Sequence, residues 1–337
     1  MAWLLISRQT VLREFDPQLI IGTVPALPVA LLSRCAGRIL GVPYAIDLRD
    51  AWPDLLNDSD QWNKAVGRES LRERVLKYGP LQLLKLLARI TVDDALANAS
   101  KIFVTSEKLG YSLEERFPRH SVGSTVFTLR NVFPIESGVS LSRGTVAKPR
   151  NTLRVLYAGT LGRAQDLSNA IKAAKRASEL GAVIELKFIG IGVAKEALRK
   201  QARELGVRAE FISRKASDSL DEYYQWADTA LVHLADWEPL TRTVPSKTYE
   251  LMASRIFITG VVEGEAAELI ENLGAGAVVP PKQPEALATL WVKLAKNDQR
   301  VEVDSRGSEW VIRERSVAVP EALAKALGPE AGRRKGE

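Results

Sequence analysis

Short apolar runs alternate with amphipathic segments along most of the chain, and the alternation is most regular after residue 150. Helical spacing of apolar positions predicts helices at 166–180, 194–205, 218–227, 245–253 and 265–272. The runs between them predict strands at 153–158, 184–189, 209–212, 229–234, 256–260 and 275–279. Because most of these strands are apolar on both faces, we expect a parallel sheet that helices cover on both sides.

The first half of the chain shows the same alternation more sparsely. It predicts strands at 18–22, 43–48, 101–105 and 125–129, and helices at 3–15, 27–40, 64–78 and 81–98. Residues 298–304 are expected to end the second sheet, and two helices follow near 305–315 and 319–327. The sequence therefore predicts an α/β protein with a first domain at 1–140, a linker at 141–151, a second domain at 152–304, C-terminal helices at 305–327 and a disordered tail at 328–337.

The composition fits a soluble globular protein, since apolar residues make up 46% and charged residues 26% of the 337 positions. No apolar run reaches the roughly 18 residues that a membrane-spanning helix needs. The single cysteine, Cys35, cannot form an internal disulfide, so we expect a reducing, cytoplasmic setting. With two histidines and one cysteine, a zinc site is close to excluded.

The net charge of +6 is concentrated in one segment. Residues 64–89 hold seven Lys and Arg side chains against two Glu, whereas residues 151–337 are nearly balanced. In the helix predicted at 81–98, Lys85 and Arg89 belong to a narrow polar stripe on an otherwise leucine-rich surface. This combination is typical of contact with an anionic membrane surface, for which 64–90 is the candidate segment. The alternative is a buried helix with a solvated basic neighbour.

Glycine-rich loops follow two strands of the second domain. Gly159, Thr160 and Gly162 follow the first strand and lead into a helix, with Arg163 next in the chain. Such a loop lets the backbone approach a ligand, and the helix start offers unpaired N–H groups to an anion. Arg163 adds a bidentate donor for phosphate oxygens. Gly190, after the second strand, is a weaker candidate, and an ordinary turn is the alternative for both loops.

Residues 244–270 carry the most informative pattern. Lys247 lies in the first turn of its predicted helix, where a cation is unfavourable unless an anion is bound beside it. Glu250 shares that face and is able to accept hydrogen bonds from two neighbouring hydroxyls. Gly264 opens the next helix, another place for an anion to meet free N–H groups. The alternatives are a surface Lys247–Glu250 ion pair and an ordinary first-turn acid at Glu265.

Residues 243–253 and 264–270 together resemble the donor-site signature of family 4 glycosyltransferases, and the resemblance extends over nearly all of 151–316. In the first half, Arg49-Asp50-Ala51-Trp52-Pro53 is similar to a motif of the N-acetylfucosamine transferase-like subgroup of surface-polysaccharide assembly. The resemblance implies the GT-B architecture of two facing Rossmann-like parallel-sheet domains. It also implies transfer of a sugar, with retention of configuration, from a nucleotide-diphosphate sugar to a lipid-linked or saccharide acceptor.

The resemblance further implies roles for individual residues. Glu250 matches the second Glu of the family's Glu-x7-Glu motif and would bind the ribose hydroxyls of the donor. Lys247 and Arg163 would hold the diphosphate, and Asp50 is the candidate for orienting the acceptor or the donor sugar. Arg214 and Lys215 match the loop that borders the base.

These roles make Asp50, Arg163 and Lys247 the expected catalytic residues. No metal and no cofactor are expected besides the nucleotide-sugar donor, which is a substrate. The expected donor-binding set is Gly159, Thr160, Gly162, Arg163, Gly190, Arg214, Lys215, Lys247, Glu250, Gly264, Glu265 and Ala266.

Three departures from the family pattern shape these expectations. The first Glu of the motif falls at Arg242, and Glu238 is the nearby candidate to replace it. The usual basic residue before the first helix of the second domain is Gln165, so Arg163 would bear more of the diphosphate binding. Members generally carry further βα units before the strand predicted at 18–22. We therefore expect the first domain to be incomplete and the chain as written to be poorly active.

Two other functions fit the same residues. One is a GT-B-like sugar-nucleotide epimerase, which would turn over without an acceptor. The other is a non-catalytic nucleotide-sugar-binding protein, which the expected incomplete first domain makes credible. Nucleic-acid binding is not indicated, because aromatic residues do not interleave with the basic ones.

Overall fold

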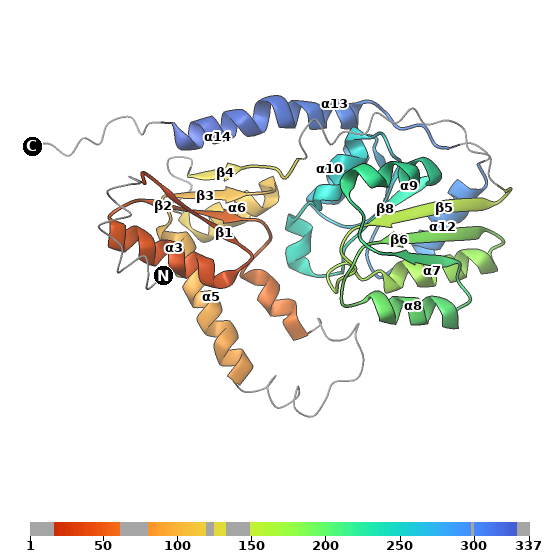
Figure 1. Cartoon of the computed structure of the whole chain (residues 1–337), viewed down its shortest axis with the longest axis horizontal. Helices are drawn as coiled ribbons and strands as arrows, with labels where there is room; N and C mark the ends of the chain where they lie inside the picture. Colours follow the sequence, from red (N-terminus) through yellow and green to blue (C-terminus); the bar gives the residue numbers. More distant parts are fainter. Residues whose placement is uncertain (1–16, 61–79, 119–124, 133–148, 298–299, 329–337) are drawn as a thin grey trace, which may run out of the picture. The chain divides into compact units, whose positions relative to one another are not determined.

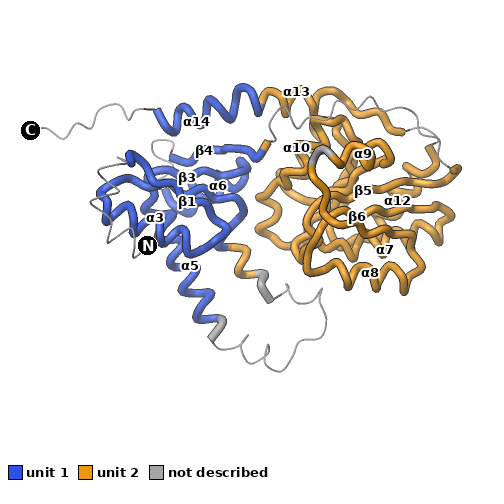
Figure 2. Tube along the Cα trace, viewed as in Figure 1, with its two compact units in different colours: residues 1–53, 82–131, 314–337 blue, residues 54–81, 132–313 orange. Residues whose placement is uncertain are grey.

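The computed structural model describes residues 17–60, 80–118, 125–132, 149–297 and 300–328 of the chain. The helices predicted at 3–15 and 64–78, most of the linker at 141–151 and nearly all of the tail at 328–337 lie outside these residues. The chain divides into two compact units, which Figure 2 distinguishes by colour. Unit 1 comprises residues 1–53, 82–131 and 314–337, and unit 2 comprises residues 54–81 and 132–313.

Unit 1 is built on a four-stranded parallel sheet with the order β1-β2-β3-β4 (Figure 1). Each strand lies within two residues of its predicted bounds, and the four are β1 (Ile20–Val24), β2 (Tyr44–Leu48), β3 (Lys101–Val104) and β4 (Val126–Thr128). The sheet's core packs against α3 (Leu27–Leu40), α5 (Pro80–Asn98) and α6 (Glu107–Arg116). All five residues of β2 are buried, as expected for a strand that is paired on both sides and covered on both faces.

The apolar pattern does not predict α6, because Gly110 interrupts a short segment with few apolar residues. The structure shows what supports the helix instead. The Oγ of Ser106 caps it by accepting the N–H of Leu109 at 3.3 Å. Gly110 is buried against the side chains of Val104 and Val126, so the helix lies close to the sheet. A side-chain cap and close packing thus take the place of a strong amphipathic period.

Unit 2 is built on a six-stranded parallel sheet with the order β10-β9-β8-β5-β6-β7. All six strands occur where the sequence predicts them, and their bounds are β5 (Thr152–Ala158), β6 (Val183–Ile189), β7 (Ala209–Ile212), β8 (Thr229–His233), β9 (Ile258–Val261) and β10 (Gly276–Val279). Strand order reverses direction at β5, whose neighbours are β6 and β8. In an open parallel sheet, ligands bind beyond the carboxyl ends of the strands at such a switch point.

Helices cover both faces of this sheet, as the apolar strands predict. On one face lie α7 (Ser168–Glu179), α8 (Lys195–Glu204) and α12 (Pro284–Ala295), and their apolar side chains share a core with β5 and β6. On the other lie α9 (Asp221–Trp226) and α10 (Ser246–Ala253) (Figure 1). A further helix, α11 (Glu265–Asn272), connects β9 to β10. This unit also contains the 3-10 turns η1 (Asp54–Asp60), η4 (Ser217–Leu220) and η5 (Glu238–Arg242).

The expectation that residues 298–304 end the second sheet is wrong for the part that the structure describes. Residues 300–304 form no strand. The carbonyl of Val303 accepts a hydrogen bond from the Arg255 guanidinium at 3.1 Å, and Val303 itself is buried. Val301 packs against the main core of unit 2. The alternating valines therefore reflect the packing of an irregular segment rather than a sheet ladder.

The last helices belong to different units. In unit 2, α13 (Arg306–Arg313) packs against α10, with Trp310 stacked on Tyr249 at 6.1 Å between ring centroids. A π-helical turn, η6 (Glu314–Ala318), leads to α14 (Val319–Leu327), which packs on β4 in unit 1. Arg130 of unit 1 lies 3.6 Å from Glu314. The chain thus returns to unit 1 at its C-terminal end.

A buried histidine joins the sheet of unit 2 to the start of α7. His233, at the end of β8, is 2% exposed, and its Nε2 lies 3.1 Å from the Nδ2 of Asn169. Burial is the main cause that lowers the pKa of His233 to about 3. The ring is therefore neutral at neutral pH and fixes the helix that follows the glycine-rich loop.

This histidine makes the stability of unit 2 sensitive to acid. Below pH 6.5 the unfolded chain takes up a proton that the folded chain excludes down to about pH 3, so stability falls as the pH falls through that window. Between pH 7 and pH 5 the effect is about 2 kcal/mol. The urea midpoint of the wild type should drop more over this range than that of His233→Gln. Equal drops would contradict the assignment, since all other groups titrate alike in both proteins.

Candidate functional site

A cavity of about 350 Å³ opens in unit 2 beyond the carboxyl ends of β5 and β6. Seven residues of the expected donor-binding set line it: Gly159, Thr160, Gly190, Arg214, Lys215, Lys247 and Glu250. Four separate segments of the chain supply them. The cavity lies at the switch point of the sheet, which is where a doubly wound fold holds ligands.

The floor of this cavity is made of two loops that pack backbone against backbone. The N–H of Gly159 donates to the carbonyl of Ile189 at 2.9 Å, and the N–H of Leu161 donates to Ile191 at 2.9 Å. A Cβ atom at Gly190, whose φ is 154°, would collide with the carbonyl of Gly159. Glycine is therefore required at position 190 for the loops to approach each other, a reason that the sequence pattern alone does not reveal.

One wall of the cavity carries a buried, hydrogen-bonded carboxylate. Glu250, from α10, is 3% exposed. Its Oε2 accepts from the Nζ of Lys247 at 2.6 Å, and its Oε1 accepts from the Oη of Tyr224 at 2.6 Å. The Lys247 Nζ also lies 3.3 Å from the Tyr224 Oη. The ion pair considered in the sequence analysis does form, but at a buried carboxylate inside a cavity rather than on an open surface.

Tyr224 is the residue of this cluster that sequence reasoning missed. It lies in α9 and is 1% exposed, and burial, followed by the charge of Glu250, raises the pKa of its hydroxyl. Nothing in the local pattern distinguishes it from Tyr223 beside it. The only signal was its helical position, one turn after the buried Leu220, which places it on the side of α9 that faces the sheet.

The charge of the cavity suits a ligand that is both anionic and hydroxylated. Arg214 and Lys215 follow β7 and are exposed at the rim, and Lys247 lies deeper beside Glu250. A carboxylate offers about four lone-pair directions, and Glu250 uses two of them within the protein. Two further hydroxyl donors can therefore be accepted. Lys247, the cation beside Glu250, is placed to bind phosphate oxygens.

The remaining expected site residues lie elsewhere. Gly162 and Arg163 line a second cavity of unit 2, described below. Gly264 precedes α11 with φ 68°, and a Cβ there would collide with the carbonyl of Thr241 in η5. Glu265 and Ala266 follow it and are buried. These three residues line neither cavity, so the structure does not group them with Glu250.

Asp50 lies in unit 1, in the loop that follows β2. Burial raises the pKa of its carboxyl. Arg49 does not pair with it, because the Arg49 Nε donates to Asp47 at 2.8 Å. An ion pair between Arg49 and Asp50 is the structural alternative to a role for Asp50 at the acceptor or the donor sugar, and this ion pair is not formed.

Arg242 occupies the place of the family's first motif glutamate and is held by two carboxylates. Its guanidinium donates to Asp54 at 3.0 Å and to Glu238 at 2.9 Å. Asp54 and Arg242 are both mostly buried. The Asp54–Arg242 ion pair joins η1 to η5. Glu238, the candidate to replace the missing motif carboxylate, accepts a hydrogen bond from Arg242 with one of its oxygens.

Two features are absent from the described part of the chain. No three His, Cys, Asp or Glu side chains gather there in a way that could hold a metal ion. None of the helices in those residues combines the length and the apolar character needed to cross a membrane.

The hydrogen bond between Tyr224 and Glu250 should be measurable as stability. Tyr224→Phe keeps the ring but leaves one oxygen of a buried carboxylate without its donor, which costs about 1–3 kcal/mol. The melting temperature of the variant should fall by several degrees. Tyr223→Phe, on the same helix, is the matched control and should change stability by less than about 0.5 kcal/mol. An equal fall in melting temperature for Tyr224→Phe and Tyr223→Phe would show that the buried Tyr224–Glu250 hydrogen bond does not stabilise the protein.

Comparison with known proteins points to one family. Residues 141–309 match the family described as glycosyl transferases group 1. Among curated proteins, the chain is similar to the putative colanic acid biosynthesis glycosyl transferase WcaI of Escherichia coli (strain K12), with 25% identity over 284 residues. That match covers 82% of this chain and 65% of WcaI. The chain therefore spans less than two thirds of the length of this relative.

Solved structures share the fold. Anabaena HepE, determined in complex with UDP and glucose, matches with a TM-score of 0.67 and 16% identity over 96% of this chain and 81% of HepE. The lipopolysaccharide outer core galactosyltransferase WaaB matches with a TM-score of 0.60 and 14% identity over 97% of this chain and 79% of WaaB. These matches confirm the expected fold class, an α/β protein of the GT-B type with two parallel sheets of four and six strands.

Proposed function

Because the chain belongs to the group 1 glycosyl transferases, the family 4 enzymes of GT-B fold, we propose that it transfers a sugar from a nucleoside-diphosphate sugar to an acceptor. The observation that carries the proposal is the buried Glu250, hydrogen-bonded to Lys247 and Tyr224 in a cavity rimmed by Arg214 and Lys215. That cavity combines an acceptor for hydroxyls with donors for phosphate, which are the two groups that a nucleoside diphosphate presents.

In this proposal Glu250 accepts hydrogen bonds from the ribose hydroxyls. Lys247 lines the same cavity, and its ammonium, held beside Glu250, is placed to bind the diphosphate as well. Arg214 and Lys215 border the base. The loop that begins at Gly159 lines the same cavity, and its small residues let a ligand approach the main chain closely.

The nucleotide is proposed to be UDP. HepE has been solved with UDP and with UDP-glucose, and it shares the fold of this chain. The donor sugar is left open, because nothing in the cavity lining of unit 2 selects one hexose over another. Uridine nucleotides are thus the first donors to test.

The chemistry of the transfer explains the cations. As the glycosidic bond of the donor breaks, positive charge develops on the sugar ring and negative charge grows on the departing diphosphate. Lys247, held in place by a buried carboxylate, is pre-organised to stabilise that negative charge. We propose retention of configuration, as family 4 implies. Asp50 remains the candidate in unit 1 for orienting the acceptor or the donor sugar.

The acceptor is proposed to belong to cell-surface polysaccharide or glycolipid synthesis. WcaI is described as acting in colanic acid biosynthesis, and WaaB as a lipopolysaccharide outer core galactosyltransferase. Within this group we propose the N-acetylfucosamine transferase-like subgroup, on the Arg49–Pro53 motif. A saccharide or lipid-linked saccharide would be the acceptor.

Donor binding tests the site directly. Glu250→Ala should weaken UDP binding by about 10- to 100-fold, because two charge-assisted hydrogen bonds to the ribose are lost. Glu250→Gln, which keeps the shape, should give a smaller loss in the same direction. Isothermal titration would measure both, with Glu204→Ala on the exposed surface of α8 as the matched control. Unchanged UDP affinity in both Glu250 variants would contradict the proposed site.

Transfer separates an enzyme from a binding protein. UDP-sugar consumption that depends on an added saccharide acceptor is the expected result. Consumption without acceptor and with isomerised donor would instead identify an epimerase. Donor binding with no turnover under any condition would identify a non-catalytic nucleotide-sugar-binding protein.

We also propose that α5 contacts an anionic membrane surface, where a lipid-linked acceptor would lie. Five large apolar side chains near its start, namely Leu83, Leu84, Leu86, Leu87 and Ile90, are 52% to 62% exposed. Lys85 and Arg89 lie on the same stretch of helix. Exposed leucines with cations among them fit the interface of an anionic bilayer, where the leucines enter the acyl boundary and the cations meet headgroups. The basic residues at 64–79 lie outside the described residues.

Vesicle sedimentation tests this contact. Vesicles with anionic lipid should bind the protein at low salt, and raising the salt should weaken binding because the cations are screened. Leu83→Asp with Leu87→Asp should reduce binding by at least about tenfold, since two apolar contacts are lost. Leu180→Asp, an exposed leucine after α7, is the control. Failure to bind anionic vesicles at low salt would end this proposal.

A further inference from the structure

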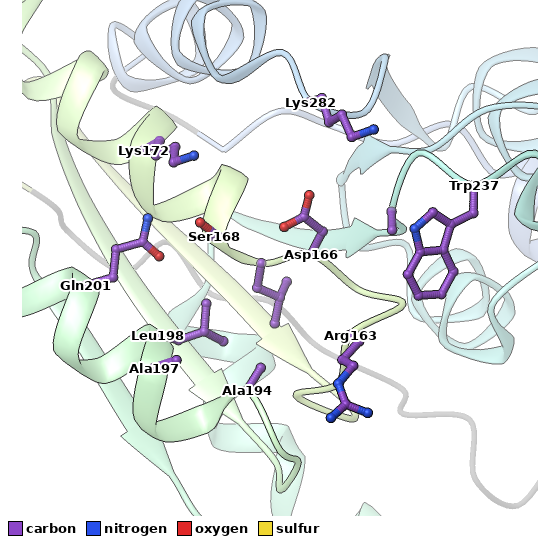
Figure 3. A pocket seen from close by; sticks show the side chains of 13 residues that line it. Arg163, Asp166, Ser168, Lys172, Ala194, Ala197, Leu198, Gln201, Trp237 and Lys282 are labelled. Carbon is purple, nitrogen blue, oxygen red and sulfur yellow. The ribbon is translucent and has the colours of Figure 1, made fainter. Parts of the chain in front are cut away.

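Unit 2 contains a second cavity that the nucleotide-binding proposal does not use. Its volume is about 320 Å³. It shares a loop with the first cavity: Gly159 and Thr160 line the first, whereas Gly162, Arg163 and Asp166 line the second. Figure 3 shows the side chains around it, which come from this loop, from α7 and α8, and from the segments that follow β8 and β10. A volume of this size is near the lower end of the range for small-molecule sites.

The lining of the second cavity is positively charged. Arg163, Lys172 and Lys282 bring three cations to it, and Asp166 brings one carboxylate. Lys282 is in addition paired with Asp236 at 2.8 Å. Burial raises the pKa of Asp166, while the charges of Lys172 and Lys282 act in the opposite direction, which places both lysines close to this carboxyl. The surplus of cations favours an anionic ligand.

Two helices begin at the same cavity. Ser168, the first residue of α7, and Ala194, which precedes α8, both line it. Neither helix has a side-chain cap at its start. The positive ends of both helix dipoles therefore add to the field of the three cations.

Strained backbone marks two of the lining residues. Asp166 has φ 38° and Lys282 has φ 56°, and both are among only four non-glycine residues with positive φ in the described chain. Glycine adopts these angles without the steric cost that a Cβ atom brings. Asp166 and Lys282 therefore occupy positions where glycine would fit the backbone better, and they do so at a cost in stability. Such strain persists where the side chain itself is needed.

The uncharged part of the lining is suited to a sugar ring. It includes the indole of Trp237, which is 8% exposed, the amide of Gln201 and the hydroxyl of Ser168 (Figure 3). Asp166 accepts hydrogen bonds from hydroxyl donors while its oxygens remain near the lysines. An aromatic face together with short polar side chains matches a ring that is apolar on its faces and carries hydroxyls on its edge.

We propose that this cavity is a second ligand site of unit 2, which binds a single sugar residue carrying an anionic group, either a carboxylate or a phosphate. The anionic group lies between Lys172 and Lys282, near the starts of α7 and α8, and the ring hydroxyls reach Asp166 and Gln201. This site goes beyond the proposed transfer and does not depend on it, because the nucleotide occupies the other cavity.

Direct binding to the full chain tests the proposal. Glucuronate is the probe for a carboxylate, glucose 6-phosphate the probe for a phosphate, and glucose the uncharged control. Isothermal titration, in the presence of saturating UDP, should show that at least one anionic probe binds at least tenfold more tightly than glucose. Tighter binding of glucuronate identifies a uronic acid as the ligand class, and tighter binding of glucose 6-phosphate identifies a sugar phosphate.

Two variants locate the site. Lys172→Ala should weaken the better probe by at least fivefold, whereas Lys175→Ala, one turn along the same exposed side of α7, should leave it unchanged. Asp166→Gly should also weaken the probe, yet it should keep or raise the melting temperature, because glycine relieves the positive φ. If Asp166 had only a structural role, its replacement would lower stability together with binding, so a loss of probe binding at unchanged melting temperature indicates contact with the ligand.

Three results would overturn the proposal. They are no binding of either anionic probe, equal effects of Lys172→Ala and Lys175→Ala, and displacement of the probe by UDP, which would put the probe in the first cavity. Glu250→Ala separates this site from the proposed function, since it should abolish tight UDP binding and leave the probe affinity intact. If UDP fails to bind the wild type, the proposed function fails while the probe and its variants still decide this inference.

Discussion

Glu250 is a carboxylate removed from water, and the free energy that its burial costs has to be offset locally. Lys247 supplies the opposite charge and Tyr224 supplies a neutral donor, each at 2.6 Å. If either partner were removed, a buried charge would be left under-satisfied, so α9 and α10 are tied to each other at this point. An apolar side chain at position 250 would stabilise the fold more than a buried carboxylate does. The carboxylate is thus best explained by the ligand that it is placed to receive.

The backbone around this cluster is shaped by the contact between the two glycine-rich loops. Because Gly190 and Gly192 have no Cβ atoms, the loop after β6 can lie directly against the loop after β5. The loop after β5 is also fixed at its C-terminal end, where His233 lies beside Asn169 at the start of α7. A loop held at both ends lines one cavity with its first residues and another with its last. One structural constraint therefore serves two places where ligands can bind.

The sequence predicts the sheet of unit 2 well, because buried parallel strands are continuous apolar runs that few other elements resemble. It also points to Lys247 and Glu250, since a lysine in the first turn of a helix conflicts with the helix dipole unless something compensates it. Other features depend on contacts between distant residues and leave no local trace. Tyr224 looks like Tyr223 until the fold puts its hydroxyl beside Glu250, and α6 depends on a cap and on close packing around Gly110. Residues 300–304 carry alternating valines that suggest a strand but pack as an irregular segment. Arg163, which the sequence predicts at the diphosphate, lines the second cavity, and its role at the diphosphate stays a prediction.

The central claim is that the cavity at Glu250 holds a nucleoside diphosphate. A crystal structure of the chain soaked with UDP tests it most directly. In that structure the ribose hydroxyls should lie within hydrogen-bonding distance of the Glu250 carboxylate, and the diphosphate should contact Lys247. A structure in which UDP binds elsewhere, with no contact to Glu250 or Lys247, would contradict it.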